Sequence, residues 1–169
     1  TKGSRNHIFA DLNFNLNENE SYESNLSVKV QRTSNDTYFR VHDINTSLVK
    51  SENTTLQNDI KYTFNKDNMF LDITGSLYEN LTEKTNARYE YILPNIIFGK
   101  TFFTEKFGSL DFRSNVFYNN YEVNKHKTFL TNDVIWKPAG IITKKGFVNS
   151  LEGMVRNKNY KARKTGVYK

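Results

Sequence analysis

The alternation of apolar and polar residues over Gly108–Tyr121 constrains the fold of this chain more than any other feature. Read with a period of two, one set of positions carries Leu110, Phe112, Ser114, Val116 and Tyr118, and the other carries Asp111, Arg113, Asn115 and Phe117. Successive side chains of a strand point to opposite faces of its sheet, whereas a helix repeats every 3.6 residues. The stretch therefore predicts a β-strand with one apolar face and one polar face.

The same pattern recurs along the chain and predicts seven further strands, at residues 6–16, 22–32, 54–64, 69–77, 87–103, 128–137 and 146–155. Short polar turns join most of them, which is typical of antiparallel hairpins. The pattern fails over 33–53, which we expect to be a long connection, and over 156–169, which we expect to be a loop or a frayed strand. No segment predicts a helix. The fold class is therefore predicted to be all-β, an antiparallel up-and-down meander of about eight long strands.

Two residues interrupt the predicted strands. Gly75 lacks a side chain to pack, and Pro94 lacks the N–H group that a ladder needs. Gly75 therefore favours a bulge or close packing at its position, and Pro94 favours a strand end, an edge or a bulge.

Composition suits a β protein in which half of every strand meets water. Aromatic residues make up 14% of the 169 residues, although the mean hydropathy is −0.70. The net charge of +6 is compatible with an anionic partner, and equally with solvated Lys-rich faces. There is no run of 18 apolar residues, so no transmembrane helix is predicted. Cysteine is absent, which excludes disulfides and thiolate metal sites.

Two architectures share this alternation. A soluble β-sandwich buries its apolar faces between two sheets, whereas a membrane barrel turns them towards lipid and lines its lumen with polar side chains. The predicted strands, at about 10 to 12 residues, exceed the roughly 5–6 of globular strands, which favours the barrel. Regular turn spacing and aromatic residues near strand ends favour it too, the latter being Tyr62, Phe64, Phe117, Tyr118, Tyr121 and Trp136.

The barrel interpretation makes a geometric prediction. Polar side chains, among them Asp59, Lys61, Asp111 and Arg113, should lie on the concave face of the meander. Ten apolar side chains should point outward from its convex face: Ile8, Leu12, Phe14, Ile60, Phe64, Leu71, Ile73, Phe112, Val116 and Val134.

Three segments also resemble a known family when taken in order. They are TSNDTYFRVHD at Thr33–Asp43, RYEYILP at Arg88–Pro94 and FGSLDFRSNVFYNNY at Phe107–Tyr121. Together they resemble the lipopolysaccharide-assembly family LptD, also called organic solvent tolerance protein. The resemblance spans roughly Val28 to Arg156, and His42 departs from it because the family has an aromatic residue there.

The resemblance implies a location and partners. The family forms a very large barrel in the Gram-negative outer membrane, with a periplasmic jellyroll ahead of it. It receives lipopolysaccharide from a periplasmic bridge of the LptA type and releases it into the outer leaflet, while an LptE-like lipoprotein plugs its lumen. Residues 1–169 would then be one domain, a part of the barrel truncated at both ends. No cofactor and no nucleic-acid partner is expected.

Candidate site residues are few. His7, His42 and His126 lie at no metal-ligand spacing, and no catalytic constellation is evident, so an enzyme is not expected. Four cations could hold lipopolysaccharide phosphates by charge-assisted hydrogen bonds, namely Lys29, Lys61, Arg88 and Arg113. The alternative is a solvated lumen wall in which carboxylates such as Asp59, Asp72 and Asp111 balance these charges.

Two other functions remain open. A complete eight-stranded barrel could act as a small membrane anchor or adhesion protein, provided that its first and last strands pair. A secreted soluble β-sandwich could bind carbohydrate or protein, provided that the apolar face is interior.

Overall fold

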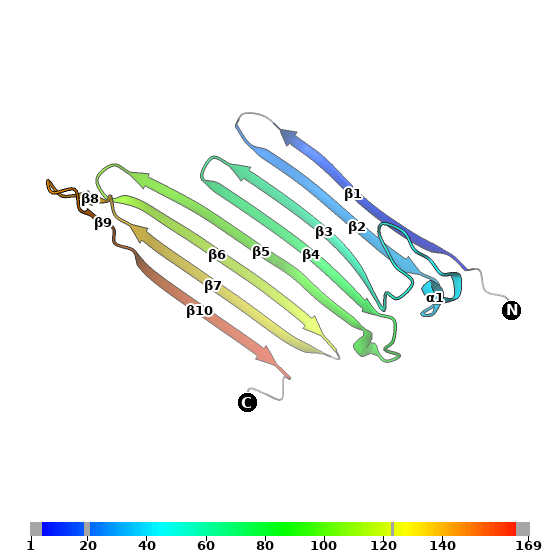
Figure 1. Cartoon of the computed structure of the whole chain (residues 1–169). Helices are drawn as coiled ribbons and strands as arrows, with labels where there is room; N and C mark the ends of the chain where they lie inside the picture. The colour runs from blue at the N-terminus through cyan, green and yellow to red at the C-terminus, as the bar shows by residue number, and fades with distance from the viewer. Residues whose placement is uncertain (1–4, 19–20, 123, 165–169) are drawn as a thin grey trace.

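A single eight-stranded antiparallel sheet makes up most of the chain in the computed structural model, which describes residues 5–18, 21–122 and 124–164 (Figure 1). Its strands are β1 (His7–Glu18), β2 (Glu23–Thr33), β3 (Thr55–Lys66), β4 (Met69–Asn80), β5 (Tyr89–Thr104), β6 (Gly108–Tyr121), β7 (Lys125–Lys137) and β10 (Gly153–Arg163). They lie in the order β1-β2-β3-β4-β5-β6-β7-β10, and each is antiparallel to its neighbours. The predicted all-β meander of eight strands is confirmed.

The last strand was predicted in the wrong place. Residues 146–155 mostly belong to the connection after β7, where β8 (Ile141–Ile142) and β9 (Val148–Asn149) form a two-stranded hairpin. Phe147 and Leu151, which produced the alternation, are 67% and 72% exposed. Strand β10 instead covers part of the basic segment, because its backbone pairs with β7 over its whole length and Arg156 pairs with Asp133 there.

Register shows that the sheet has two chemically different faces. Cross-strand partners share a face, and the pairing links Phe14 through β2 and β3 to Ile73, and Ile73 through β5 to Val116. The ten apolar residues predicted to share a face all lie on this one, the apolar face. The opposite face, called the polar face, carries Lys61 and Asn115.

The apolar face is open in the described part of the chain. Ile8 is 59% exposed and Ile60 is 53% exposed, and no second sheet of the described residues packs over them. Of the six aromatic residues near strand ends that favoured the barrel, two do not lie on the apolar face. Phe117 and Tyr121 alternate with Tyr118 and so belong to the polar face.

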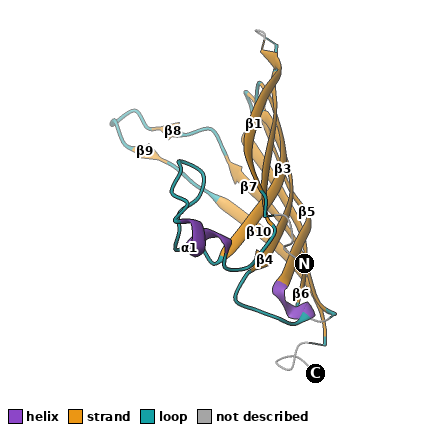
Figure 2. Ribbon diagram, turned by 90° about the vertical axis from the view of Figure 1, so that its right-hand side faces the viewer, coloured by secondary structure: helices purple, strands orange, loops and turns teal. Residues whose placement is uncertain are grey.

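A long connection packs on one end of the polar face. Residues 34–54 join β2 to β3 and contain the helix α1 (Tyr38–His42), where no helix was predicted. The side-chain Oδ1 of Asn35 accepts hydrogen bonds from the Thr37 N–H and hydroxyl, an Asx turn that starts the helix. Figure 2 shows this connection and the β8–β9 hairpin on the same side of the sheet. None of the helices in the described ranges is long and apolar enough to cross a membrane.

The predicted interruptions are confirmed as a bulge. Register shifts between Thr74 and Ser76 on β4 and between Ile92 and Asn95 on β5, so Gly75 and Pro94 both lie within it. A Cβ at Gly75 would collide with the Leu93 side chain.

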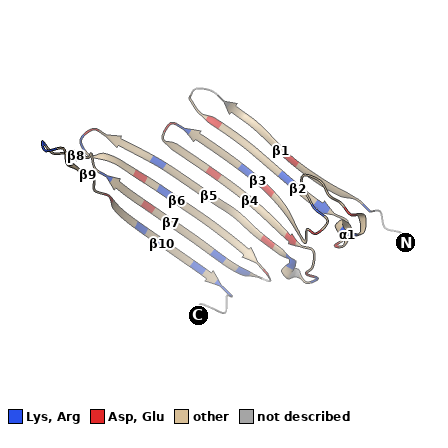
Figure 3. Ribbon diagram, in the orientation of Figure 1, with Lys and Arg blue, Asp and Glu red and all other residues tan. Residues whose placement is uncertain are grey.

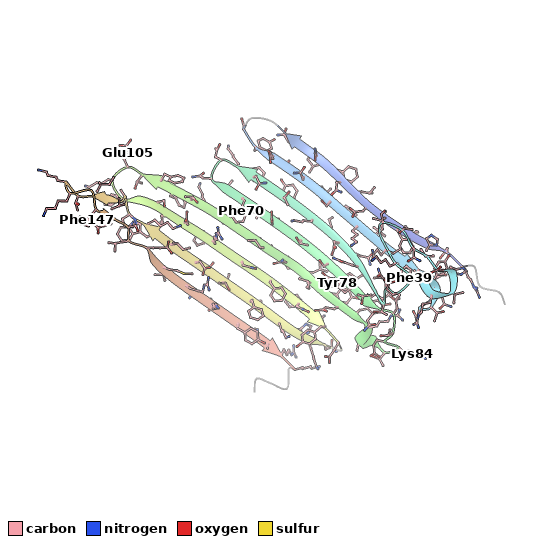
Figure 4. All side chains as sticks on the ribbon, in the orientation of Figure 1. Phe39, Phe70, Tyr78, Lys84, Glu105 and Phe147 are labelled. Atoms are coloured by element: carbon pink, nitrogen blue, oxygen red, sulfur yellow. The ribbon has the colours of Figure 1, made fainter. Side chains whose placement is uncertain are left out.

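A second glycine is required for a different reason. Gly99 of β5 pairs with Phe70 of β4, and the Phe70 ring, labelled in Figure 4, occupies the space that a Cβ at Gly99 would fill. An aromatic ring laid over a strand glycine restores contacts that the missing side chain cannot make.

Candidate functional site

The register of five strands builds a groove on the polar face. Asp11 pairs with Lys29 and Lys29 with Asp59, and one step along the strands Ser27 pairs with Lys61. These side chains line a hollow of about 500 Å³ together with residues of β4 and β5, the full set being Asp11, Asn13, Ser27, Lys29, Gln57, Asp59, Lys61, Thr74, Ser76, Tyr78, Ile92 and Asn95. Two of the four predicted cations, Lys29 and Lys61, are therefore brought together.

Charges in this groove balance one another. Gln57 accepts a hydrogen bond from Lys29 Nζ at 3.5 Å and donates one to Asp59 Oδ2 at 2.6 Å. Lys61 Nζ lies 3.9 Å from Asp72 Oδ2, as predicted for a pair across the sheet. The two lysines face the two lining carboxylates Asp11 and Asp59. Figure 3 shows acidic and basic positions interspersed along the strands. The groove is polar, but its lining carries no net charge.

The third predicted cation lies in a separate cluster towards β10. Arg113 of β6 pairs with Asp133 of β7, and Asp133 pairs with Arg156 of β10. The Asp133 carboxylate accepts both bonds of the Arg156 fork, from Nε at 2.6 Å and from Nη2 at 2.8 Å. A bidentate pair of this kind stabilises one geometry more firmly than a lysine pair does. This pairing holds β10 in register against β7.

The fourth predicted cation serves as an anchor for the connection that carries α1. Arg88 lies in the short 3₁₀ turn η1 (Asn86–Arg88) ahead of β5, and its Nη2 donates to Glu79 Oε1 at 2.6 Å and to Asp36 Oδ1 at 2.9 Å. The hydrogen bond from Arg88 to Asp36, supported by the charge of Glu79, raises the pKa of Arg88 above its usual range. Because Asp36 belongs to the 34–54 connection and Glu79 to β4, the guanidinium ties the connection to the sheet.

A small core completes this attachment, and the sequence did not reveal it. Phe39, Val49, Leu56 and Leu81 are buried together, with Phe39 and Leu56 each only 1% exposed. The Phe9 ring, which belongs to the polar face, stacks on Phe39 with 5.5 Å between centroids. The adjacent Tyr38–Phe39 pair was the signal, since two aromatic residues inside an otherwise polar segment indicate that something is buried.

The three histidines lie beside tyrosines rather than beside metal ligands. His7 Nδ1 lies 2.9 Å from the Tyr38 hydroxyl, and the His42 ring also packs on Tyr38, with 4.5 Å between the ring centroids. His126 Nδ1 lies 2.7 Å from the Tyr118 hydroxyl. Among the residues that the structure describes, no group of three histidines or acids could hold a metal ion.

The arrangement can therefore bind and orient polar molecules along the groove, and the 34–54 connection covers part of the same face. No family model matches the chain, and no similar curated protein or solved structure is found.

Proposed function

We propose that this sheet is part of the wall of a β-barrel in the outer membrane, with its apolar face towards lipid and its polar face towards the lumen. One observation carries the proposal: eight long strands form a single layer whose apolar side chains lie on one open face. In water such a face would be unfavourable, since large exposed apolar patches mark contact with another apolar surface. In a bilayer it is the expected lining of a barrel exterior.

The dimensions of the apolar face support this environment. From Ile8 to Leu16 along β1, eight steps of about 3.4 Å give roughly 27 Å of apolar strand face, which becomes about 19–22 Å of depth at a tilt of about 35–45°. The apolar band of outer-membrane barrels is about 25 Å tall.

Aromatic side chains border one end of this face. Trp136 donates its Nε1–H to the carbonyl oxygen of Phe107 at 2.8 Å, and both line an apolar hollow with Phe102 and Leu110. At the same end Tyr22 packs on Phe64 with ring centroids 5.6 Å apart. Rings of this kind are typical of the boundary between acyl chains and headgroups, because they join an apolar body to a polar tip.

Within this barrel, we propose a role in moving lipopolysaccharide to the outer leaflet, on the basis of the LptD resemblance. An LptE-like plug and an LptA-like bridge would be its partners. The polar groove with Lys29 and Lys61 is the candidate contact for polar parts of the glycolipid. Its balanced charge supports passage rather than tight retention, since neither sign predominates along its lining.

Thiol labelling tests the membrane environment directly, because residues 1–169 contribute no background cysteine. Single cysteines at Ile60 and Val116 are compared with their neighbours Lys61 and Asn115, in the protein as the cell makes it. We expect an impermeant maleimide to modify positions 61 and 115, and bromolipids to quench a fluorophore at 60 and 116. Equal labelling of all four, or quenching at none, would overturn the wall proposal.

Photocrosslinking tests the proposed cargo separately. A photoreactive residue at Lys29 or Lys61 should capture lipopolysaccharide in cells, and the same residue at Asn115 serves as the control because it lies on the polar face outside the groove. If labelling supports the wall but neither groove position captures lipopolysaccharide, the barrel assignment stands and the transport role is wrong.

A further inference from the structure

A second hollow, on the apolar face, has a different chemistry from the rest of that face. It lies where β6 ends, β7 begins and β10 ends, and has a volume of about 240 Å³. Register places Tyr118 beside Thr128 and Thr128 beside Lys161, and aligns His126 with Arg163. These five residues line the hollow, and all share the face of Val116.

The cations of this hollow have no acidic partner. Neither Lys161 nor Arg163 forms an ion pair within the described ranges, and no carboxylate is among the lining residues. Lys61, Arg88 and Arg156 are by contrast each paired with a carboxylate. The hollow is therefore a place where two neighbouring cations on the apolar face have no carboxylate of the described residues beside them.

Hydrogen-bond donors are held in place beside this charge. The Tyr118 and His126 rings stack with centroids 5.7 Å apart, and the Tyr118 hydroxyl lies 2.7 Å from His126 Nδ1. When Nδ1 accepts the tyrosine proton, the proton of the neutral imidazole is on Nε2, which becomes a donor. Thr128 adds a hydroxyl.

We propose that this hollow binds the phosphate of an anionic membrane lipid. The inference rests on the proposed function, because a face in contact with acyl chains places the side chains at its end at headgroup depth. Lysine and arginine donate charge-assisted hydrogen bonds to phosphate oxygens, and basic clusters at a membrane boundary recognise anionic headgroups. The tyrosine ring beside them suits the same depth.

Native mass spectrometry of the whole protein, reconstituted in mixed phosphatidylglycerol and phosphatidylcholine nanodiscs and released into detergent, tests this site. We expect the wild type to retain phosphatidylglycerol preferentially. The double variant Lys161→Gln/Arg163→Gln should lower that retention roughly tenfold, since each cation near an anionic surface contributes a severalfold factor. The matched control Lys127→Gln/Lys158→Gln removes the same charge from the polar face of the same two strands and should retain the lipid.

Three outcomes would overturn the inference: equal retention of the two lipids, equal loss in both double variants, or displacement of phosphatidylglycerol by inorganic phosphate at comparable concentration. The last would indicate a site for free phosphate instead of a lipid. Membrane integration, measured by resistance to carbonate extraction, separates this failure from that of the wall proposal. A protein that integrates without lipid preference contradicts only the lipid site.

Discussion

Two long connections leave this sheet at opposite ends and on the same side, yet they differ completely in packing (Figures 2 and 4). Residues 34–54 bury Phe39 to 1% exposure and are tied to the sheet by Arg88. Residues 138–152 hold Ile142, Phe147 and Val148, which are 72%, 67% and 71% exposed. Apolar content is therefore not what decides whether a connection packs.

The difference lies in what each connection meets on the sheet. The first connection packs on Phe9, an aromatic residue on the polar face. Its Ser34 N–H donates a hydrogen bond to the carbonyl oxygen of Asn6, and its Asp36 carboxylate accepts one from Arg88. In the second, Glu152 lies 3.8 Å from Lys137 of β7, but Thr143 and Phe147 exchange hydrogen bonds within their own hairpin and the apolar side chains have no apolar partner on the described part of the sheet that would bury them. A connection packs where the strands offer it an apolar contact and a charged anchor together.

Truncation of the buried ring should produce the largest contrast. Phe39→Ala removes the centre of a well-packed cluster and should lower the free energy of opening of residues 34–54 by about 3 kcal/mol or more. The change should appear as faster amide exchange over residues 38–49 and faster tryptic cleavage after Arg40 and Lys50. Phe147→Ala should change stability by less than about 0.5 kcal/mol, as expected for an exposed side chain. Similar effects of the two variants would refute the comparison.

Loss of the anchor should have a smaller effect. Arg88→Gln removes the charge shared by Asp36 and Glu79 and should cost about 1–2 kcal/mol, a figure reduced because Asp36 is 44% exposed on its side chain. Amide exchange in residues 34–54 reports the loss. Lys84→Gln, which removes a nearby charge that belongs to neither pair, is the matched control and should leave exchange unchanged.

A double-mutant cycle sharpens this result. If Arg88 acts through Asp36, the combination Arg88→Gln/Asp36→Asn should cost less than the sum of the two single changes. Strict additivity would show that the ion pair to the connection contributes nothing.

Acidification should give the smallest effect, confined to the turn between β4 and β5. Hydrogen bonds from the Thr85 hydroxyl, Thr85 N–H and Lys84 N–H lower the pKa of the Glu83 carboxyl. A lowered carboxyl pKa stabilises the turn above the pKa of the unfolded chain, and this stabilisation is lost as pH falls through the folded value. The amide resonance of Thr85 should therefore titrate below the usual glutamate range. In Thr85→Ala the midpoint should move back towards that range, and an unmoved midpoint would contradict the assignment.

Strand alternation predicted most of the fold because a period of two is a property of neighbouring residues. Both faces of β6 and the bulge at Gly75 and Pro94 followed from local patterns. Strand β10 did not, because its pairing depends on Asp133 and the free edge of β7, which are distant in sequence from Arg156. A pattern within one segment carries no information about which other strand that segment will pair with.

Sites were harder to predict than strands for the same reason. Lys29, Lys61 and Arg113 were correctly assigned to the polar face, but the side chains that they meet come from neighbouring strands and depend on the register. Arg88 carries the same charge and lies outside the groove, at the base of a connection. Residue type alone cannot separate a ligand-binding cation from a structural one.

The pairing of Gly99 with Phe70 has a consequence for how this sequence can change over time. The ring occupies the space of the absent side chain, so neither position can vary freely while the other stays fixed. A larger residue at 99 becomes accessible only after position 70 has shrunk, and a smaller residue at 70 leaves bare backbone on the polar face. Positions 70 and 99 should therefore evolve as a coupled pair, and the order in which they mutate decides which sequence variants of this sheet are accessible.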